Sequence, residues 1–569
     1  MAGVSRTVRV ALVVPLLLTA AACSDGPAPA PAAPQQSVPA LPSQSATPGD
    51  PVAAALTRMS DADLAGQVLM PYAYGSAATS VDKAASAGNQ GLAGVNTPAE
   101  MIAKFHLGGL ILVSFTAQDP TGATNPTTNV ENPKQVRELT DGLQAAARQT
   151  PGGAPLMIGI DQEYGVVTRV TNGVTMLPSA MAAGAAGQPK LTETAWHAAG
   201  EELAAMGVTV DFAPVADTLG PPDNTVIGSR SFGADATANA GQVAAAVRGL
   251  EKAGVTAGLK HFPGHGHTSG DSHDGLPVVT QSRAAWDTQD LPPFRSGVEA
   301  GAGVVMSGHL DVQALDKGVP ATFSHKVMTD ELRGKLKFTG VAVTDAMNMP
   351  PAMKWPPGEA AVRALNAGND MLLMPPNITA ARDGIVAALK DGSLKRERLV
   401  EAVTRILTLK LRRPTAPRPD VSTVGSPAHT AAVAPLAAAA VTVLRGKCSG
   451  PLVTGPVSVS ADDVRATART TFIKELQTAG LTVQPTGGSV IRLVGYGDKP
   501  TDLDQTAAIT IMMDTPHLLT SSTSKTLIAT YSSSRLSLAA AAKVIAGKAK
   551  AAGRSPVAIS GLPASACDR

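Results

Sequence analysis

The sequence is poor in the residues that build disulfide frameworks and nucleic-acid interfaces. It has three cysteines, and aromatic residues make up only 3% of its 569 residues. Its 47 Lys and Arg nearly balance its 45 Asp and Glu. Because the sequence has almost no excess of positive charge, we expect no nucleic-acid partner. Charged residues reach only 16% and hydrophobic residues 44%, which excludes a disordered polymer.

Long hydrophobic runs are also scarce, and the clearest one lies near the N-terminus. Arg6 and Arg9 precede an apolar run over 10–18, and small residues follow it. This run is too short to span a membrane. A charged start, a short apolar run and small residues together predict an export signal over 1–22.

The residues around Cys23 decide between two fates for the exported protein. The small residues before Cys23 resemble a bacterial lipobox, although Ala20 stands where leucine is usual. In that case Cys23 is lipidated and anchors the protein to the outer face of the bacterial cell membrane. We expect this lipid anchor to be the only attachment to the membrane. The alternative is a plainly secreted protein. Residues 23–50 are rich in Pro, Ala, Ser and Gln, which predicts a solvated tether.

Two further cysteines, Cys448 and Cys567, form an even pair in an oxidising compartment. A disulfide between them would close a loop of more than a hundred residues. In the chain-entropy model such a bond stabilises the fold by about 4 to 5 kcal/mol. Two buried free thiols are the alternative.

From 51 to 411, short apolar runs alternate with longer amphipathic ones. Short and almost wholly apolar runs indicate parallel strands that are buried on both faces. Seven are visible, at 109–113, 156–160, 208–212, 256–260, 304–307, 341–344 and 371–374. The pattern predicts a (β/α)8 barrel of the TIM type, with the eighth strand either near 172–181 or before residue 100. Helices are expected at 133–148, 192–206, 236–253, 293–300, 329–336 and 360–367.

A second domain follows a proline-rich break. Residues 412–424 predict a linker, and 425–569 again alternate strand-like and helix-like runs. This layout predicts a smaller doubly wound α/β sandwich domain. It holds no glycine loop of the phosphate-binding type and no carboxylate pair of catalytic character, so we expect no cofactor.

Reactive side chains are densest in the loop at 260–277, directly after a predicted strand. The loop contains four glycines, which makes it a poor core element, and its histidines are His261, His265, His267 and His273. Neither a His-Glu-x-x-His motif nor a cysteine-containing set is present, so we expect no metal. The remaining interpretations are a turn whose histidines cap backbone groups and a catalytic loop.

Polar residues directly after the predicted strands favour the catalytic interpretation. They are Asp161, Asp217, Lys260, His261, His309 and Asp345. The carboxyl ends of barrel strands meet at one mouth, where such barrels carry their active sites. Asp217 and His309 are assigned to this mouth by the strand pattern alone.

Five short stretches occur in a fixed order along the first domain. They are Ile-Asp-Gln-Glu at 160–163, Leu-Pro-Ser-Ala-Met at 177–181, Ile-Gly-Ser-Arg-Ser-Phe-Gly at 227–233, the 260–273 loop, and Val-Thr-Asp-Ala-Met-Asn-Met at 343–349. Together they resemble glycoside hydrolase family 3, specifically its bacterial N-acetyl-β-glucosaminidase branch, over about residues 56–411. The resemblance implies a catalytic barrel that is often followed by an α/β domain.

The resemblance also implies the chemistry. Asp345 matches the family's nucleophile, which attacks the anomeric carbon and forms a glycosyl-enzyme. A helix-capping role is the alternative. In this branch a histidine replaces the usual acid as proton donor, and the matching residue is His273. Asp271 lies two residues earlier and points to the same side in an extended loop, where it can orient the imidazole.

Substrate contacts follow from the same resemblance. The matching sugar-binding positions are Asp161, Arg169, Arg230, Lys260 and His261. The chain has Tyr164-Gly165 where Gly-Gly is frequent, and Ala346 where a second Asp is frequent. These departures lie outside the proposed chemistry and leave fine specificity open.

We therefore expect a monomeric, retaining exo-β-N-acetylglucosaminidase whose carbohydrate substrates are cell-wall (peptidoglycan) fragments. A β-glucosidase or β-xylosidase of the same family is one rival. Those enzymes usually take their acid from a glutamate in the second domain, so the Asp271 and His273 pair argues against them. An N-acetylglucosaminide phosphorylase and a non-catalytic sugar-binding lipoprotein are the other rivals.

Overall fold

The computed structural model describes residues 50–114, 128–268, 270–411 and 418–568. The predicted export signal, almost all of the tether, Cys23 and half of the predicted linker lie outside these residues. Among the described helices, none combines the length and the apolar character that crossing a membrane requires.

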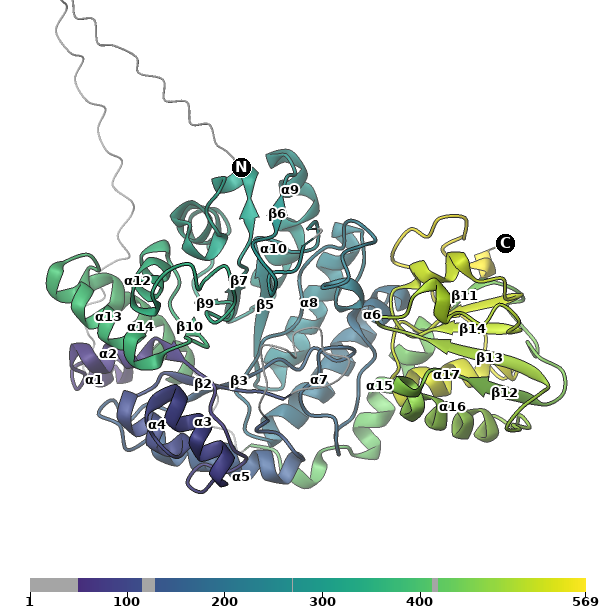
Figure 1. Cartoon of the computed structure of the whole chain (residues 1–569), viewed down its shortest axis with the longest axis horizontal. Helices are drawn as coiled ribbons and strands as arrows, with labels where there is room; N and C mark the ends of the chain where they lie inside the picture. Colours follow the sequence, from purple (N-terminus) through teal and green to yellow (C-terminus); the bar gives the residue numbers. More distant parts are fainter. Residues whose placement is uncertain (1–49, 115–127, 269, 412–417, 569) are drawn as a thin grey trace, which may run out of the picture. The chain divides into compact units, whose positions relative to one another are not determined.

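Short parallel strands build the barrel of the first domain (Figure 1). Eight of the described strands belong to the barrel, and β6 (Val278–Val279) and β8 (Asp311–Val312) form a separate parallel pair. Six of the eight form an all-parallel sheet in spatial order: β2 (Gly109–Leu112), β3 (Met157–Ile160), β4 (Val210–Asp211), β5 (Thr256–Phe262), β7 (Val304–Ser307) and β9 (Val341–Thr344). The strands β1 (Leu69–Met70) and β10 (Leu372–Leu373) form a parallel pair. A bridge from Val343 to Met371 joins β9 to this pair, and the Ile111 N–H donates to the Pro71 carbonyl beyond β1. The predicted barrel is confirmed, and its eighth strand is β1, before residue 100.

The barrel strands are buried on both faces, as their apolar sequences predict. Helices flank them: α4 (Pro98–Phe105), α5 (Pro133–Ala147), α7 (Pro189–Ala205), α8 (Ala236–Lys252), α10 (Leu291–Glu299), α12 (Pro357–Ala367), α13 (Ile378–Asp391) and α14 (Arg396–Leu411). Side-chain caps set several helix starts; Asn132 accepts from the Gln135 N–H, and Asp235 accepts from the Ala238 N–H. The helix expected at 329–336 belongs to a longer π-helix, η4 (Lys326–Lys335).

The second domain is a five-stranded sheet in the order β11 (Thr442–Arg445), β15 (Thr526–Ala529), β14 (Ile509–Met512), β13 (Ser489–Val494) and β12 (Val457–Ser460). Only β11 runs antiparallel to its neighbour. One face packs against α16 (Ala466–Thr478) and α17 (Arg535–Ile545), where Phe472 and Leu538 are buried. The other face shares a core with the barrel residues Met181 and Ile227. The barrel therefore covers the face on which a free-standing doubly wound domain carries further helices.

A disulfide joins Cys448 and Cys567, whose Cα atoms are 5.3 Å apart. Cys448 follows β11, and Cys567 lies in the last helical turn, η9 (Ala566–Asp568). The bond spans a sequence separation of 119 residues and so encloses most of the second domain. Closing a loop of this length removes conformational freedom mainly from the unfolded chain.

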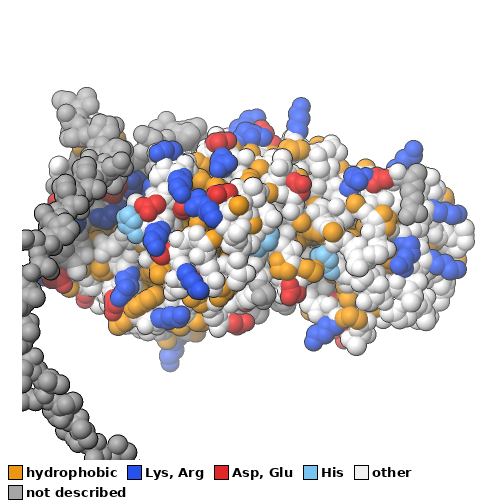
Figure 2. Space-filling view, turned by 90° about the horizontal axis from the view of Figure 1, so that it is seen from above, with side chains coloured by type: hydrophobic (Ala, Val, Ile, Leu, Met, Phe, Trp, Pro, Cys, Tyr) orange, Lys and Arg blue, Asp and Glu red, His pale blue; other side chains and the backbone are white. Residues whose placement is uncertain are grey.

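Surface charge is mixed in sign. On the face drawn in Figure 2, basic and acidic side chains are interspersed between apolar and neutral ones. Elsewhere, exposed charges pair along and between helices, as in Arg363 with Glu359 and Arg248 with Glu193. Such pairs contribute little stability each, but their mixing prevents a strong field of one sign.

Asp370, two residues before β10, pairs with three arginines, more than any other carboxylate in the described part of the barrel. It is fully buried, and Arg398 and Arg405 donate to its Oδ1 at 2.9 and 3.1 Å. Arg333 and the Ala342 N–H donate to its Oδ2 at 2.5 and 3.0 Å. Burial opposes ionisation, but the three guanidinium groups outweigh it and lower the pKa of Asp370.

Replacing Asp370 with asparagine is expected to lower the free energy of unfolding by about 3 to 5 kcal/mol, because three guanidinium groups lose their common buried partner. Urea unfolding at neutral pH measures the loss. Since the folded-state pKa of Asp370 is depressed, its contribution is present above the unfolded-state pKa and disappears as pH falls through the folded-state value. The difference between wild type and variant should therefore shrink in acid.

Asp383→Asn is the matched control. Its carboxylate is 59% exposed and pairs only with the neighbouring Arg382. Its loss should change stability by less than about 1 kcal/mol. Equal unfolding midpoints for the two variants would contradict the role given to Asp370.

Candidate active site

A pocket at the carboxyl ends of the barrel strands gathers most of the predicted site residues. It opens to solvent, and the empty space in and at the mouth of the pocket is about 540 Å³. Seven predicted residues line it: Asp161, Arg169, Arg230, Lys260, His261, His273 and Asp345. Asp161 follows β3, Lys260 and His261 end β5, and Asp345 follows β9. The parallel strands thus bring together side chains that are far apart in sequence.

Asp345 faces this pocket at the end of β9. Its backbone N–H donates to the Ser307 carbonyl at 2.9 Å, which fixes the strand end, and its Oδ1 accepts from the Ala346 N–H at 2.7 Å. Burial opposes ionisation of Asp345, but the nearby His261, His309 and His273 outweigh it and lower its pKa. The next helix, α12, begins only at Pro357, so Asp345 is not a helix cap. It is an ionised carboxylate available for attack.

His273 and Asp271 form the predicted pair, but by a different local geometry. We expected an extended loop; the chain instead turns here, and the Gly275 N–H donates to the Asp271 carbonyl at 3.1 Å. Asp271 Oδ1 accepts from the His273 backbone N–H at 2.8 Å and lies 2.7 Å from His273 Nδ1. The turn therefore directs Nδ1 to the carboxylate and leaves Nε2 available to the pocket.

A chain of alternating charges forms one wall of the pocket. Lys260 Nζ lies 2.7 Å from Asp161 Oδ1 and 2.6 Å from Glu163 Oε1. Arg230 donates twice to Glu163, at 2.7 and 2.9 Å. Burial opposes ionisation of Glu163, but Arg230 and Lys260 outweigh it and lower its pKa to about 2. Each charge is thereby held in place before any ligand arrives.

Glu163 was not among the predicted site residues. Its signal was present, because Asp161 and Glu163 are two residues apart at a strand end, where such residues point to the same side. Arg169 completes the wall with NH2 at 3.3 Å from Asp161 Oδ2, and burial lowers its pKa to about 9. Asp161 retains a side-chain exposure of 14%, more than Glu163 or Lys260, and is the wall's most accessible hydrogen-bond acceptor.

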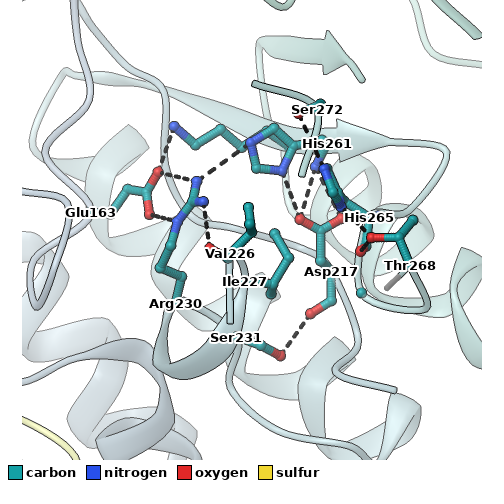
Figure 3. A network of polar contacts seen from close by, with 12 residues as sticks. Glu163, Asp217, Val226, Ile227, Arg230, Ser231, His261, His265, Thr268 and Ser272 are labelled. Atoms are coloured by element: carbon teal, nitrogen blue, oxygen red, sulfur yellow. Dashed lines mark hydrogen bonds and ion pairs between the residues drawn. The ribbon is translucent and has the colours of Figure 1, made fainter. Parts of the chain in front are cut away.

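Two predicted substrate contacts need correction. Asp217 and His309 are fully buried and do not line the pocket. Asp217 accepts from the His261 N–H at 3.1 Å and lies 2.7 Å from His261 Nδ1 (Figure 3). His309 Nε2 lies 3.0 Å from the Ala346 carbonyl, next to Asp345. Both follow strands as predicted, but their side chains turn behind the pocket wall and hold the residues that line it.

The remaining lining residues were not among the predicted site residues. His265 and Ser272 come from the same loop as His273. The other lining residues are apolar: Val167, Val226, Met306, Ala346, Met349, Leu373 and Met374. Scattered apolar residues carry no motif, so only the folded chain could bring them together.

The pocket is close to electrically neutral. Three carboxylates, Asp161, Glu163 and Asp345, line it together with three cations, Arg169, Arg230 and Lys260. Such a set can hydrogen-bond hydroxyl groups without demanding a charged ligand. A carboxylate and a histidine in the same cavity supply a nucleophile and a proton donor.

Comparison with known families agrees with this geometry. A model described as the glycosyl hydrolase family 3 N terminal domain matches residues 78–409, which is more than half of the chain. The chain belongs to glycosyl hydrolase family 3. The matched residues contain every family 3 motif recognised in the sequence.

Individual family 3 proteins are similar over different lengths. Beta-hexosaminidase A of Pseudoalteromonas piscicida is 36% identical over 383 residues, which cover 62% of this chain and 62% of that protein. Beta-hexosaminidase LpqI of Mycobacterium tuberculosis is 32% identical and is covered over 77% of its length. The solved family 3 beta-N-acetylglucosaminidase of Paenibacillus sp. str. FPU-7 superposes with a TM-score of 0.75 at 31% identity, covering 88% of this chain and 99% of that one.

Proposed function

We propose that this protein is a retaining exo-β-N-acetylglucosaminidase. The observation that carries the proposal is the shared pocket of Asp345 and His273. The names of its relatives support a β-hexosaminidase activity rather than another family 3 activity. The neutral pocket suits an uncharged amino sugar at the non-reducing end of a chain.

In the proposed reaction, the Asp345 carboxylate attacks the anomeric carbon while His273 Nε2 protonates the departing oxygen. The glycosyl-enzyme ester forms as the glycosidic bond breaks. The neutral His273 then removes a proton from water, which attacks the same carbon and releases Asp345 with net retention. Asp271 keeps the imidazole oriented in both steps.

We further propose that the natural substrates are cell-wall fragments in which N-acetylglucosamine is linked to N-acetylmuramic acid. The predicted export signal at 1–22 supports this choice, because it directs the protein to the compartment that holds such fragments. Lipidation of Cys23, an anchor at the outer face of the membrane and a monomeric state belong to the same proposal. Radiolabelled fatty acid incorporated into wild type but not into Cys23→Ala would support the anchor.

Wild type is expected to cleave p-nitrophenyl N-acetyl-β-glucosaminide with a kcat/KM about tenfold or more above that for the β-glucoside, because each hydrogen bond to the acetamido group contributes up to about 1.5 kcal/mol. Release of p-nitrophenol measures both rates. Faster cleavage of the glucoside would contradict the proposal. Sugar phosphate formed when phosphate is added would instead identify a phosphorylase.

A further inference from the structure

Ser272 lies in sequence between the two members of the catalytic pair and lines the same pocket as His273. The side chains of His273 and Asp271 are 16% and 22% exposed, whereas Ser272 is buried, with 2% of its surface exposed. Its Oγ lies 3.2 Å from Nε2 of His265 (Figure 3). The proposed reaction gives neither residue a task.

The His265 ring lies between two hydroxyl groups. Its Nδ1 lies 2.8 Å from Thr268 Oγ1, and its Nε2 lies 3.2 Å from Ser272 Oγ. Burial, followed by the nearby His261, lowers the pKa of His265 to about 4, so the ring is neutral at pH 7. A neutral imidazole has one donor and one acceptor nitrogen, and a hydroxyl can pair with either, so the ring hydrogen-bonds to both residues.

His265 itself is firmly anchored. Its backbone N–H donates to Asp217 Oδ1 at 2.7 Å, and Asn224 Nδ2 donates to its carbonyl at 2.9 Å. The next residue, Gly266, approaches the Thr218 backbone so closely that a Cβ would lie 1.8 Å from that carbonyl oxygen. Asp217 also holds His261, which lines the sugar pocket. One buried carboxylate thus connects a sugar-wall histidine to the base of the catalytic loop.

We propose that His265 is a positioning residue for proton donation, acting through Ser272. The inference rests on the proposed function. The Ser272 to His265 hydrogen bond ties the turn that carries Asp271 and His273 to the buried Asp217, and so keeps His273 Nε2 at the departing oxygen. No substrate contact by His265 is required.

Replacing Ser272 with alanine tests the role through leaving groups. The variant should lose roughly three- to tenfold in kcat/KM with the phenyl N-acetylglucosaminide, whose leaving group needs a proton, because one buried hydrogen bond is lost. With the 2,4-dinitrophenyl glycoside, which departs without a proton, the loss should stay below about twofold. That second rate also reports an intact, folded pocket. An equal loss on both substrates, or no loss on either, would overturn the proposal.

The double variant His265→Ala with Ser272→Ala separates positioning from general support of the fold. Because both residues act through one hydrogen bond, the kcat/KM for the phenyl glycoside relative to that for the 2,4-dinitrophenyl glycoside should be no lower than in Ser272→Ala alone. A further decrease of that ratio when His265→Ala is added to Ser272→Ala would overturn the inference. Ser80→Ala, an exposed serine of the first domain, is the control and should match wild type. If wild type cleaves neither glycoside, the proposed function fails instead.

Discussion

Asp345→Ala is expected to lower kcat for aryl N-acetylglucosaminides by on the order of 10⁴- to 10⁶-fold, the range seen when a covalent nucleophile is removed. The carboxylate ends β9, faces the pocket and has a pKa held below its usual range, so wild type carries the reactive form throughout neutral pH. Azide should partly restore turnover by entering the space left by the carboxylate. One displacement inverts the anomeric carbon, so the product should be the α-glycosyl azide.

The controls for this prediction separate chemistry from folding. Asp383→Ala removes an exposed carboxylate of α13 that does not line the pocket, and it should leave kcat unchanged. Because the pKa of Asp345 is lowered, loss of activity through its protonation should begin only at a pH below that at which an ordinary aspartate becomes protonated. Turnover by Asp345→Ala within tenfold of wild type, or a β-azide product, would exclude Asp345 as the nucleophile.

His273→Ala is expected to lower kcat/KM by roughly 10²- to 10⁴-fold for phenyl glycosides, because the departing oxygen no longer receives a proton. The 2,4-dinitrophenyl glycoside should be much less affected in kcat/KM, since its leaving group departs unprotonated. Hydrolysis of the trapped glycosyl-enzyme also slows without the base. Azide should relieve that step and give the β-glycosyl azide, since it attacks in place of water after the first inversion.

His325→Ala offers the comparison for the histidine variant. That imidazole is 64% exposed and pairs only with the exposed Asp330, so its removal should not change either rate. An equal loss on both leaving groups in His273→Ala would point to a damaged pocket rather than a missing proton donor. An α-glycosyl azide product would contradict the proposal that His273 acts on the β face of the sugar.

The barrel could be predicted because its signal is local. Apolar runs such as 304–307 and 341–344 must be buried on both faces wherever they lie, and their alternation with amphipathic helices leaves few topologies. The position of the eighth strand was ambiguous because its local signal is weak. Leu69–Met70 is too short to show a pattern of its own and becomes a strand only through its pairing with β10.

The active-site residues also divide into those that the sequence could place and those that only the tertiary structure could place. The sequence by itself determined that Asp345, Lys260 and His261 lie at the ends of strands of one barrel, and parallel strands bring such residues to one mouth. Only the tertiary structure decided which way each side chain turns. Asp217 and His309 also follow strands, yet their side chains are buried behind the pocket wall. Glu163, in contrast, lines the pocket, where Arg230 and Lys260 hold it. The reason is physical: strand order follows from local apolar patterns, but side-chain direction depends on partners that lie up to 100 residues away in the chain, as Lys260 does from Asp161 at a separation of 99.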